Sequence, residues 1–158
     1  MTRTPEDVQK ALDSFEVKTE IVRFEETTRT AQDAADAIGT ELGSIIKSLC
    51  FSVDGDPVLI LTAGDRKVDN RKVAEIYGVG RKRVKIADAE TTLSVTGYAP
   101  GGVPPVGHET EIAVLIDESL SRFETVYGAG GSDNSIFPIG YSRLVEITGG
   151  QVADVVKD

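Results

Sequence analysis

Lys47 occupies a position in the sequence that calls for a chemical explanation. Segment 45–53 alternates as a β-strand does, and the residues that share one face with Lys47 are all apolar: Ile45, Leu49, Phe51 and Val53. Burying an unpaired ammonium group is costly, so this lysine needs a polar partner or an opening. Two interpretations stay open at this point. The ammonium either meets a ligand, or it reaches solvent at the beginning of the strand.

Two glycine-rich stretches are the next candidates for chemistry. Residues 96–108 read TGYAPGGVPPVGH, and residues 128–134 read GAGGSDN. Glycine lets a backbone approach a ligand closely, and proline stiffens a loop. Such loops can present N–H groups to a carbonyl or a phosphate. The alternative is that both are plain connections.

The residues of the common catalytic constellations are scarce. The single histidine, His108, lies in the glycine–proline stretch and is expected to be an exposed loop residue. The single cysteine, Cys50, alternates with Ser48 and Ser52 and is expected to face the core instead of acting as a nucleophile. One His and one Cys also argue against a zinc site, so no metal is expected. The acidic residues are scattered and suggest no acid–base pair.

One segment of the chain is basic although the chain as a whole is acidic. Residues 66–85 hold eight basic and two acidic residues, so with a net charge of −9 the rest of the chain carries −15. This segment either binds a polyanion locally or is a solvated surface that serves solubility.

The elements that must position these residues follow from periodicity and capping signals. Helices are expected where apolar residues recur at helical spacing after a capping residue, at 5–15, 31–38, 70–77, 88–95 and 142–147. Strands are expected at 18–24, 45–53, 57–63, 83–86, 111–117, 124–127, 136–139 and 152–156. Asp54-Gly55 predicts a hairpin, and hairpins mixed with strand–helix–strand links predict a mixed α/β sheet.

Composition limits the class of protein. A chain of 158 residues with 40% hydrophobic residues suits one globular domain, expected here over 1–158. With one cysteine and no apolar signal core near the N-terminus, a cytoplasmic location is expected. No stretch approaches a membrane span, and neither a dinucleotide fingerprint nor a phosphate loop occurs.

Three segments, taken in order, resemble the YbaK/prolyl-tRNA synthetase-associated editing domain family. The first is 30–39 with the strand segment IIKSLCF at 45–51, which resembles the family pattern I-x-K-S/T-L-x-F. The second is 64–74. The third is 97–107, where GVPPVG resembles G-x-x-P-x-G. The resemblance runs from residue 5 to residue 157.

This resemblance implies a mixed α/β domain whose curved, barrel-like sheet is flanked by helices. It implies an aminoacyl-tRNA deacylase that acts in trans, with alanine or cysteine on proline tRNA as the leading substrates and no cofactor. Lys47 matches the family's catalytic lysine, which holds the 3′ end of the substrate. The positions that match the aminoacyl pocket are Gly101, Gly102, Val103, Pro105, Gly107, Ala129, Gly130 and Ser132.

The remaining expectations concern partners. Arg81, Lys82 and Arg83 are expected to contact tRNA, a synthetase is a candidate partner, and the chain is expected to be a monomer or weak homodimer. The nucleophile is either water or a group of the substrate. Two rival functions stay open: a non-catalytic module that binds an aminoacyl or nucleotide-like ligand, and a hydrolase of small amino-acid esters or thioesters.

Overall fold

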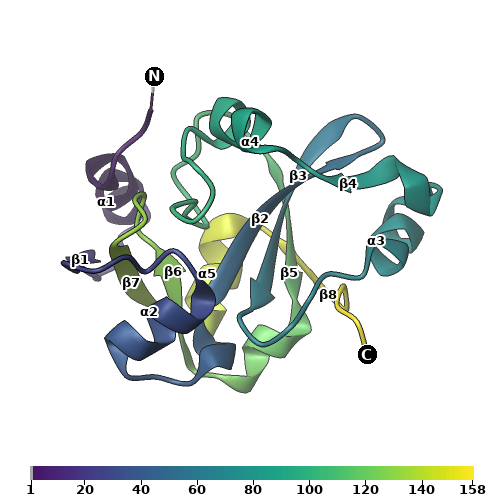
Figure 1. Cartoon of the computed structure of the whole chain (residues 1–158). Helices are drawn as coiled ribbons and strands as arrows, with labels where there is room; N and C mark the ends of the chain where they lie inside the picture. The colour runs from purple at the N-terminus through teal and green to yellow at the C-terminus, as the bar shows by residue number, and fades with distance from the viewer. Residues whose placement is uncertain (1) are drawn as a thin grey trace.

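The structure is a computed structural model, which describes residues 2–158. In this part of the chain, eight strands form two sheets, with five α-helices and three 3-10 turns between and around them (Figure 1). The five-stranded sheet has the order β4-β2-β3-β5-β8, and the three-stranded sheet has the order β1-β7-β6. Both antiparallel and parallel pairs occur in the larger sheet, so the predicted mixed α/β sheet is confirmed.

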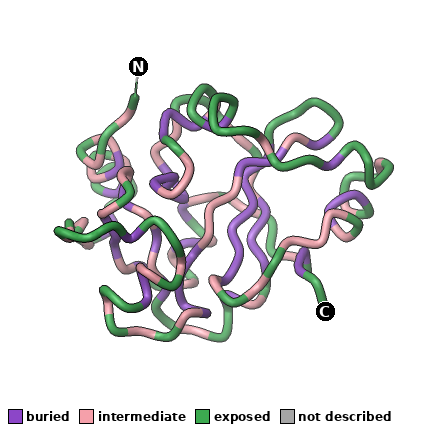
Figure 2. Tube along the Cα trace, in the orientation of Figure 1, coloured by how far each residue is buried: buried purple, intermediate pink, exposed green. Residues whose placement is uncertain are grey.

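The centre of the larger sheet is the predicted hairpin. Strands β2 (Ile46–Val53) and β3 (Asp56–Ala63) pair antiparallel over their whole length around Asp54-Gly55. Strand β4 (Val84–Ile86) pairs antiparallel with β2. On the other side of the hairpin, β5 (Ala113–Asp117) pairs parallel with β3, and β8 (Gln151–Ala153) pairs parallel with β5. The two central strands are among the most buried parts of the chain (Figure 2).

The smaller sheet lies against the beginning of β2. It contains β6 (Thr125–Ala129), β7 (Ser135–Gly140) and the short β1 (Val22–Arg23). A parallel bridge between Ile45 and Tyr127 connects the two sheets. This junction brings the second glycine-rich turn, which joins β6 to β7, close to Lys47 in β2.

The helices begin and end largely where the capping residues predict. The α-helices are α1 (Pro5–Ser14), α2 (Ala31–Ile38), α3 (Asn70–Tyr77), α4 (Ala89–Thr96) and α5 (Tyr141–Thr148). The 3-10 turns are η1 (Leu42–Ser44), η2 (Arg81–Arg83) and η3 (Glu118–Arg122). The hydroxyl of Thr30 accepts a hydrogen bond from the N–H of Asp33, and this cap fixes where α2 begins.

Some sequence-based expectations need correction. The expected strand at 18–24 is reduced to β1, because only two residue pairs join it to β7. The expected closing strand at 152–156 is shorter in the structure, and beyond β8 only an isolated bridge between Val68 and Val156 continues it. The barrel-like closure is not confirmed, since within residues 2–158 β4 and β8 end the larger sheet as open edges.

No helix within residues 2–158 combines the length and the apolar character that crossing a membrane requires.

Candidate active site

A cavity of about 320 Å³ lies where the two sheets, the start of α2 and the glycine–proline loop meet. Its volume is near the lower end of ligand pockets, which hold roughly 300–1,000 Å³. The cavity therefore suits a small ligand group. Its lining comes from four parts of the chain: Thr28–Ala31 and Ala34; Ile45–Leu49; Gly101 and Val103; and Tyr127–Ala129 with Ser135 and Ile136.

Lys47 lines this cavity and is half-buried. Its Nζ donates a hydrogen bond to the backbone carbonyl of Arg66, which supplies the polar partner that the sequence called for. An ammonium group has three donors, so this bond leaves others for a ligand. Burial lowers the pKa of Lys47, the positive charge of Lys67 lowers it further, and Asp65 opposes both effects.

The carbonyl that accepts from Lys47 lies on a braced turn after β3. Asp65 in this turn forms two hydrogen bonds with the guanidinium of Arg122, at 2.7 and 3.0 Å. These bonds also lower the pKa of the Asp65 carboxyl group. The turn packs closely on the backbone before β2, because a Cβ on Gly64 would lie 2.4 Å from the carbonyl oxygen of Leu42. The turn that carries the partner of Lys47 is thus held by contacts with two other parts of the chain, at Arg122 and at Leu42.

The two glycine-rich stretches touch each other beside the cavity. A Cβ on Gly102 would lie 3.0–3.1 Å from three backbone atoms of Ser132, so a side chain here would force the two stretches slightly apart. Val103 and Ala129, one from each stretch, line the cavity. The structure therefore brings Lys47, Gly101, Val103 and Ala129 of the predicted site to one cavity.

The other predicted pocket residues lie behind this lining. Gly102 lies against Ser132 at the contact between the two stretches. Gly130 and Ser132 belong to the turn between β6 and β7 and stabilise it. The N–H of Gly130 donates to the carbonyl of Ser135, and the hydroxyl of Ser132 donates to the Ser135 hydroxyl. Pro105 and Gly107 line a more open hollow of about 650 Å³ that also contains His108.

His108 is partly buried, which corrects the expectation of an exposed residue. Its Nε2 lies 2.7 Å from the carbonyl oxygen of Pro104, and burial lowers its pKa. His108 is not among the residues that line the 320 Å³ cavity. Cys50 is buried with 3% exposure, as predicted, and burial raises the pKa of its thiol.

Sequence reasoning missed the segment before α2 as part of the site. Thr28 is buried, and its N–H donates to the carbonyl of Asp133 at 2.6 Å. The hydroxyl of Thr27 donates to the same carbonyl at 3.1 Å, so this segment is fastened to the turn between β6 and β7. Thr28, Arg29 and Thr30 all line the cavity. The run TTRT at 27–30, directly before a predicted helix, is the sequence signal of this segment, and its pattern by itself predicts only a helix cap.

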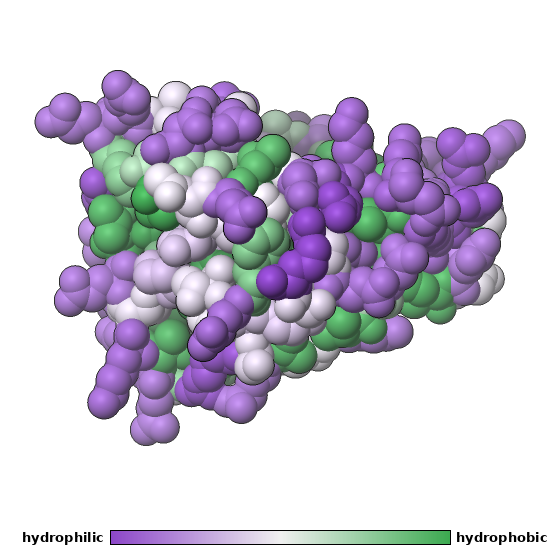
Figure 3. Space-filling view, turned by 90° about the horizontal axis from the view of Figure 1, so that it is seen from below, coloured by the Kyte–Doolittle hydropathy of each residue, from purple (hydrophilic) through white to green (hydrophobic). Residues whose placement is uncertain are grey.

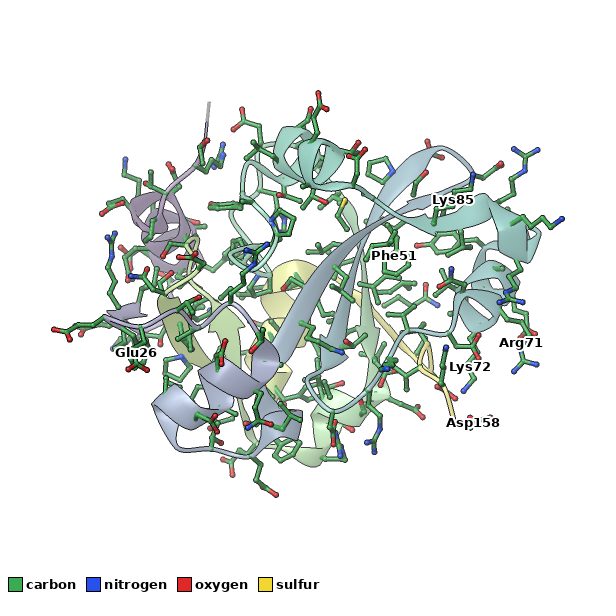
Figure 4. All side chains as sticks on the ribbon, in the orientation of Figure 1. Glu26, Phe51, Arg71, Lys72, Lys85 and Asp158 are labelled. Atoms are coloured by element: carbon green, nitrogen blue, oxygen red, sulfur yellow. The ribbon has the colours of Figure 1, made fainter. Side chains whose placement is uncertain are left out.

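The predicted tRNA-binding residues lie away from the cavity. Arg81, Lys82 and Arg83 are exposed in η2, beside α3 and β4 at the end of the molecule opposite α1 (Figure 1). In Figure 3 this end, at the right, is covered mainly by hydrophilic side chains. Figure 4 labels three further cations there, Arg71, Lys72 and Lys85, of which Lys72 forms an ion pair with Asp158. The structure therefore separates the basic surface from the cavity.

Comparisons with known proteins agree with this geometry. Residues 25–147 match the model of the aminoacyl-tRNA editing domain. A crystal structure described as that of a proposed trans-editing enzyme for prolyl tRNA synthetase superimposes with a TM-score of 0.92 at 34% identity, covering 100% of this chain and 99% of the other.

Relatives in the curated proteins include stand-alone chains and parts of synthetases. YwhH of Bacillus subtilis (strain 168), an uncharacterized protein, is 38% identical over 88% of each chain. EbsC of Enterococcus faecalis, named as a proposed Cys-tRNA(Pro)/Cys-tRNA(Cys) deacylase, is 24% identical over 80% of this chain and 76% of its own. A proline–tRNA ligase of Thermoanaerobacter sp. is 26% identical over 97% of this chain, which spans 27% of the ligase. This chain belongs to the aminoacyl-tRNA editing domain family.

Proposed function

We propose that this protein hydrolyses the ester bond of wrongly charged aminoacyl-tRNA in trans, with Ala-tRNA(Pro) or Cys-tRNA(Pro) as substrate. The observation that carries the proposal is the small cavity that is lined both by Lys47 and by residues of the two glycine-rich stretches. The names of EbsC and of the trans-editing structure support the substrate class. The reaction would take place in the cytoplasm, where a synthetase charges tRNA.

In this proposal Lys47 binds and orients the 3′ end of the substrate. Its spare N–H donors can reach a ribose or phosphate oxygen while the third remains on the Arg66 carbonyl. The aminoacyl group then enters the apolar part of the cavity, which includes Ala34, Val103 and Ile136. A small cavity favours a short side chain, such as that of alanine or cysteine.

Backbone N–H groups would stabilise the negative charge that develops on the carbonyl oxygen. One well-placed donor of this kind contributes about 3 kcal/mol. The N–H groups of Gly102 and Gly130 already donate within the loops, to Ala99 and Ser135 at 3.0 and 2.9 Å. The donors would therefore come from Gly101 or Val103, which line the cavity. Water or a group of the substrate serves as the nucleophile.

One observation favours a second candidate, a non-catalytic binding module. The residues that line the cavity include no Asp, Glu, His or Cys, so Lys47 and Tyr127 are the only groups of the lining that could act as a general base. Under this alternative the same cavity recognises an aminoacyl or nucleotide-like ligand without turnover.

The test is deacylation of proline tRNA charged with alanine, cysteine or proline, by the wild type and by Lys47→Ala. We expect selective hydrolysis of one wrong amino acid and a loss of about tenfold to hundredfold in kcat/KM in the variant, as for a lost hydrogen bond to a charged group. Lys10→Ala, an exposed lysine on α1, is the matched control.

The fold of each variant must be checked by thermal unfolding. A Lys47→Ala protein that unfolds early, and whose folded fraction retains full activity, contradicts the role given to Lys47. A wild type that binds charged tRNA and hydrolyses none of the three substrates points to another mischarged tRNA or to the binding module.

A further inference from the structure

Lys47 is not the only cation at the cavity, because Arg29 lines it as well. No Asp or Glu is among the lining residues. Within residues 2–158 the ion pairs involve neither Arg29 nor Lys47. In a chain with a net charge of −9, the cavity thus holds two positive charges without an acidic neighbour in its lining. Such a site favours an anionic ligand group.

The structure holds Arg29 at the edge of the cavity. Its N–H donates to the hydroxyl of Thr27, and Thr28 next to it is bound to the carbonyl of Asp133. The Arg29 stem crosses Gly101, where a Cβ would lie 2.5 Å from Arg29 Cγ. Gly101 has φ +92°, a conformation that also favours glycine. Arg29 is itself exposed, so the side chain lies on the loop while its charged end faces solvent at the mouth.

We infer that Arg29 binds the phosphate group of the terminal nucleotide of the substrate. This inference rests on the proposed function and deepens it. A cavity of about 320 Å³ is small, so it suits the acyl group and part of the ribose but leaves the phosphate outside. Arg29 is the exposed cation of the lining, whereas Lys47 is half-buried. A guanidinium can bind a phosphate through two parallel hydrogen bonds, which a lysine cannot do.

The experiment uses a minimal substrate, the alanyl ester of adenosine, prepared with and without a 5′-phosphate. The measured quantity is the phosphate preference, the ratio of kcat/KM for the two esters. For the wild type we expect a preference of about tenfold to hundredfold, as for a charge-assisted hydrogen bond. Arg29→Ala should reduce the ratio to near one, and Arg29→Lys should keep part of it.

Arg23→Ala is the matched control. This exposed arginine lies in the same part of the chain, pairs with Glu6 and is not among the residues lining the cavity. Its variant should keep the wild-type ratio. If Arg29→Ala lowers both rates equally, Arg29 shapes the cavity and the inference is overturned.

Binding measurements separate this inference from the hydrolase proposal. Calorimetric titration with adenosine and with adenosine 5′-monophosphate needs no turnover. If no ester is hydrolysed but the wild type prefers the monophosphate and Arg29→Ala does not, the phosphate site stands and the hydrolase fails. If the esters are hydrolysed and the wild type shows no phosphate preference in rate or binding, the hydrolase stands and the phosphate site fails.

Discussion

At the scale of single residues, the environment of Lys47 explains how a lysine can lie on an apolar strand face. The cross-strand neighbour of Lys47 in β3 is Thr62, which is fully buried, and no hydrogen bond joins the two side chains in the described residues 2–158. The ammonium extends instead to the carbonyl of Arg66. The aliphatic part of the Lys47 side chain therefore lies on the apolar strand face, and its ammonium group is bound by a carbonyl oxygen. Partial burial still disfavours the charged form, and this lowers the pKa of Lys47.

The first prediction concerns this pKa. Burial and Lys67 lower the pKa of Lys47 below its ordinary value of 10.5. Replacing Lys67 by glutamine removes one of the two causes, so the pKa should rise toward 10.5 in Lys67→Gln. NMR titration of the Lys47 Cε signal measures it. Lys85→Gln is the control, because Lys85 lies in β4 beside the far end of β2. Equal midpoints in Lys67→Gln and the wild type would contradict the assignment.

The same pKa has a consequence for stability, and its sign can be worked out. The unfolded chain holds the proton of Lys47 more tightly than the folded protein does. The free energy of unfolding should therefore rise with pH between the lowered folded pKa and 10.5. In Lys47→Met this contribution to the rise should vanish, as urea unfolding at several pH values would show. An unchanged pH dependence would mean that the folded protein does not disfavour the charge.

At the scale of elements, the site depends on contacts between loops that belong to different sheets. The glycine–proline loop follows α4, and the turn between β6 and β7 belongs to the smaller sheet. Gly102 of the glycine–proline loop lies on the backbone of Ser132 in the β6–β7 turn. The same loop approaches β6 at Gly128, where an added Cβ would lie 3.1 Å from Pro105. Both close contacts lie next to residues that line the cavity, Gly101, Val103 and Ala129.

The second prediction compares two glycines. Gly102→Ala places a methyl group 3.0 Å from the backbone of Ser132, so we expect a loss of about 1–3 kcal/mol in unfolding free energy and reduced deacylation. Gly80→Ala is the matched control, because nothing lies within 4 Å of its Cβ and its φ is −72°. It should change stability by less than about 1 kcal/mol. Urea unfolding measures both, and equal losses would show that the loop contact is not tight.

At the scale of the whole molecule, the basic surface at η2 and the cavity at Lys47 lie at opposite ends of β2. Lys47 lies near the start of β2 and the basic residues of η2 adjoin its end, where Val53 pairs with Val84. At about 3.3 Å per residue, the six steps from Lys47 to Val53 span about 20 Å. Figure 4 shows Lys85, Arg71, Lys72 and Asp158 at this end and Glu26 at the opposite one. A bound tRNA would place its 3′ end in the cavity and its duplex nearer η2.

The third prediction tests that arrangement. Reversing Arg81, Lys82 and Arg83 to glutamate should weaken tRNA binding and lower the slope of log K against log salt by up to about 2–3, since each phosphate contact contributes about 0.7–0.9. Reversing Lys10, Lys18 and Arg23, which are exposed, gives a control with the same net charge. If both triple variants behave alike, only net charge matters and η2 makes no contact with tRNA.

The local pattern of the chain determined most of its elements. Caps such as Thr30 and the Asp54-Gly55 turn act through neighbouring backbone groups, so the sequence alone places the start of α2 and the hairpin of β2 and β3. The order of motifs also identified the family, which the domain match confirms. The helix start and the hairpin depend only on interactions between residues close in sequence, and the family assignment depends only on the order of residue types.

The tertiary structure decided what surrounds Lys47. The carbonyl of Arg66, the approach of Gly102 to Ser132 and the place of Arg29 at the cavity join parts of the chain that are far apart in sequence. The open sheet edges and the burial of His108 were also beyond local pattern, since both depend on which segments pair and pack. Spacing shows which residues share a strand face, but only the packed chain shows what that face meets.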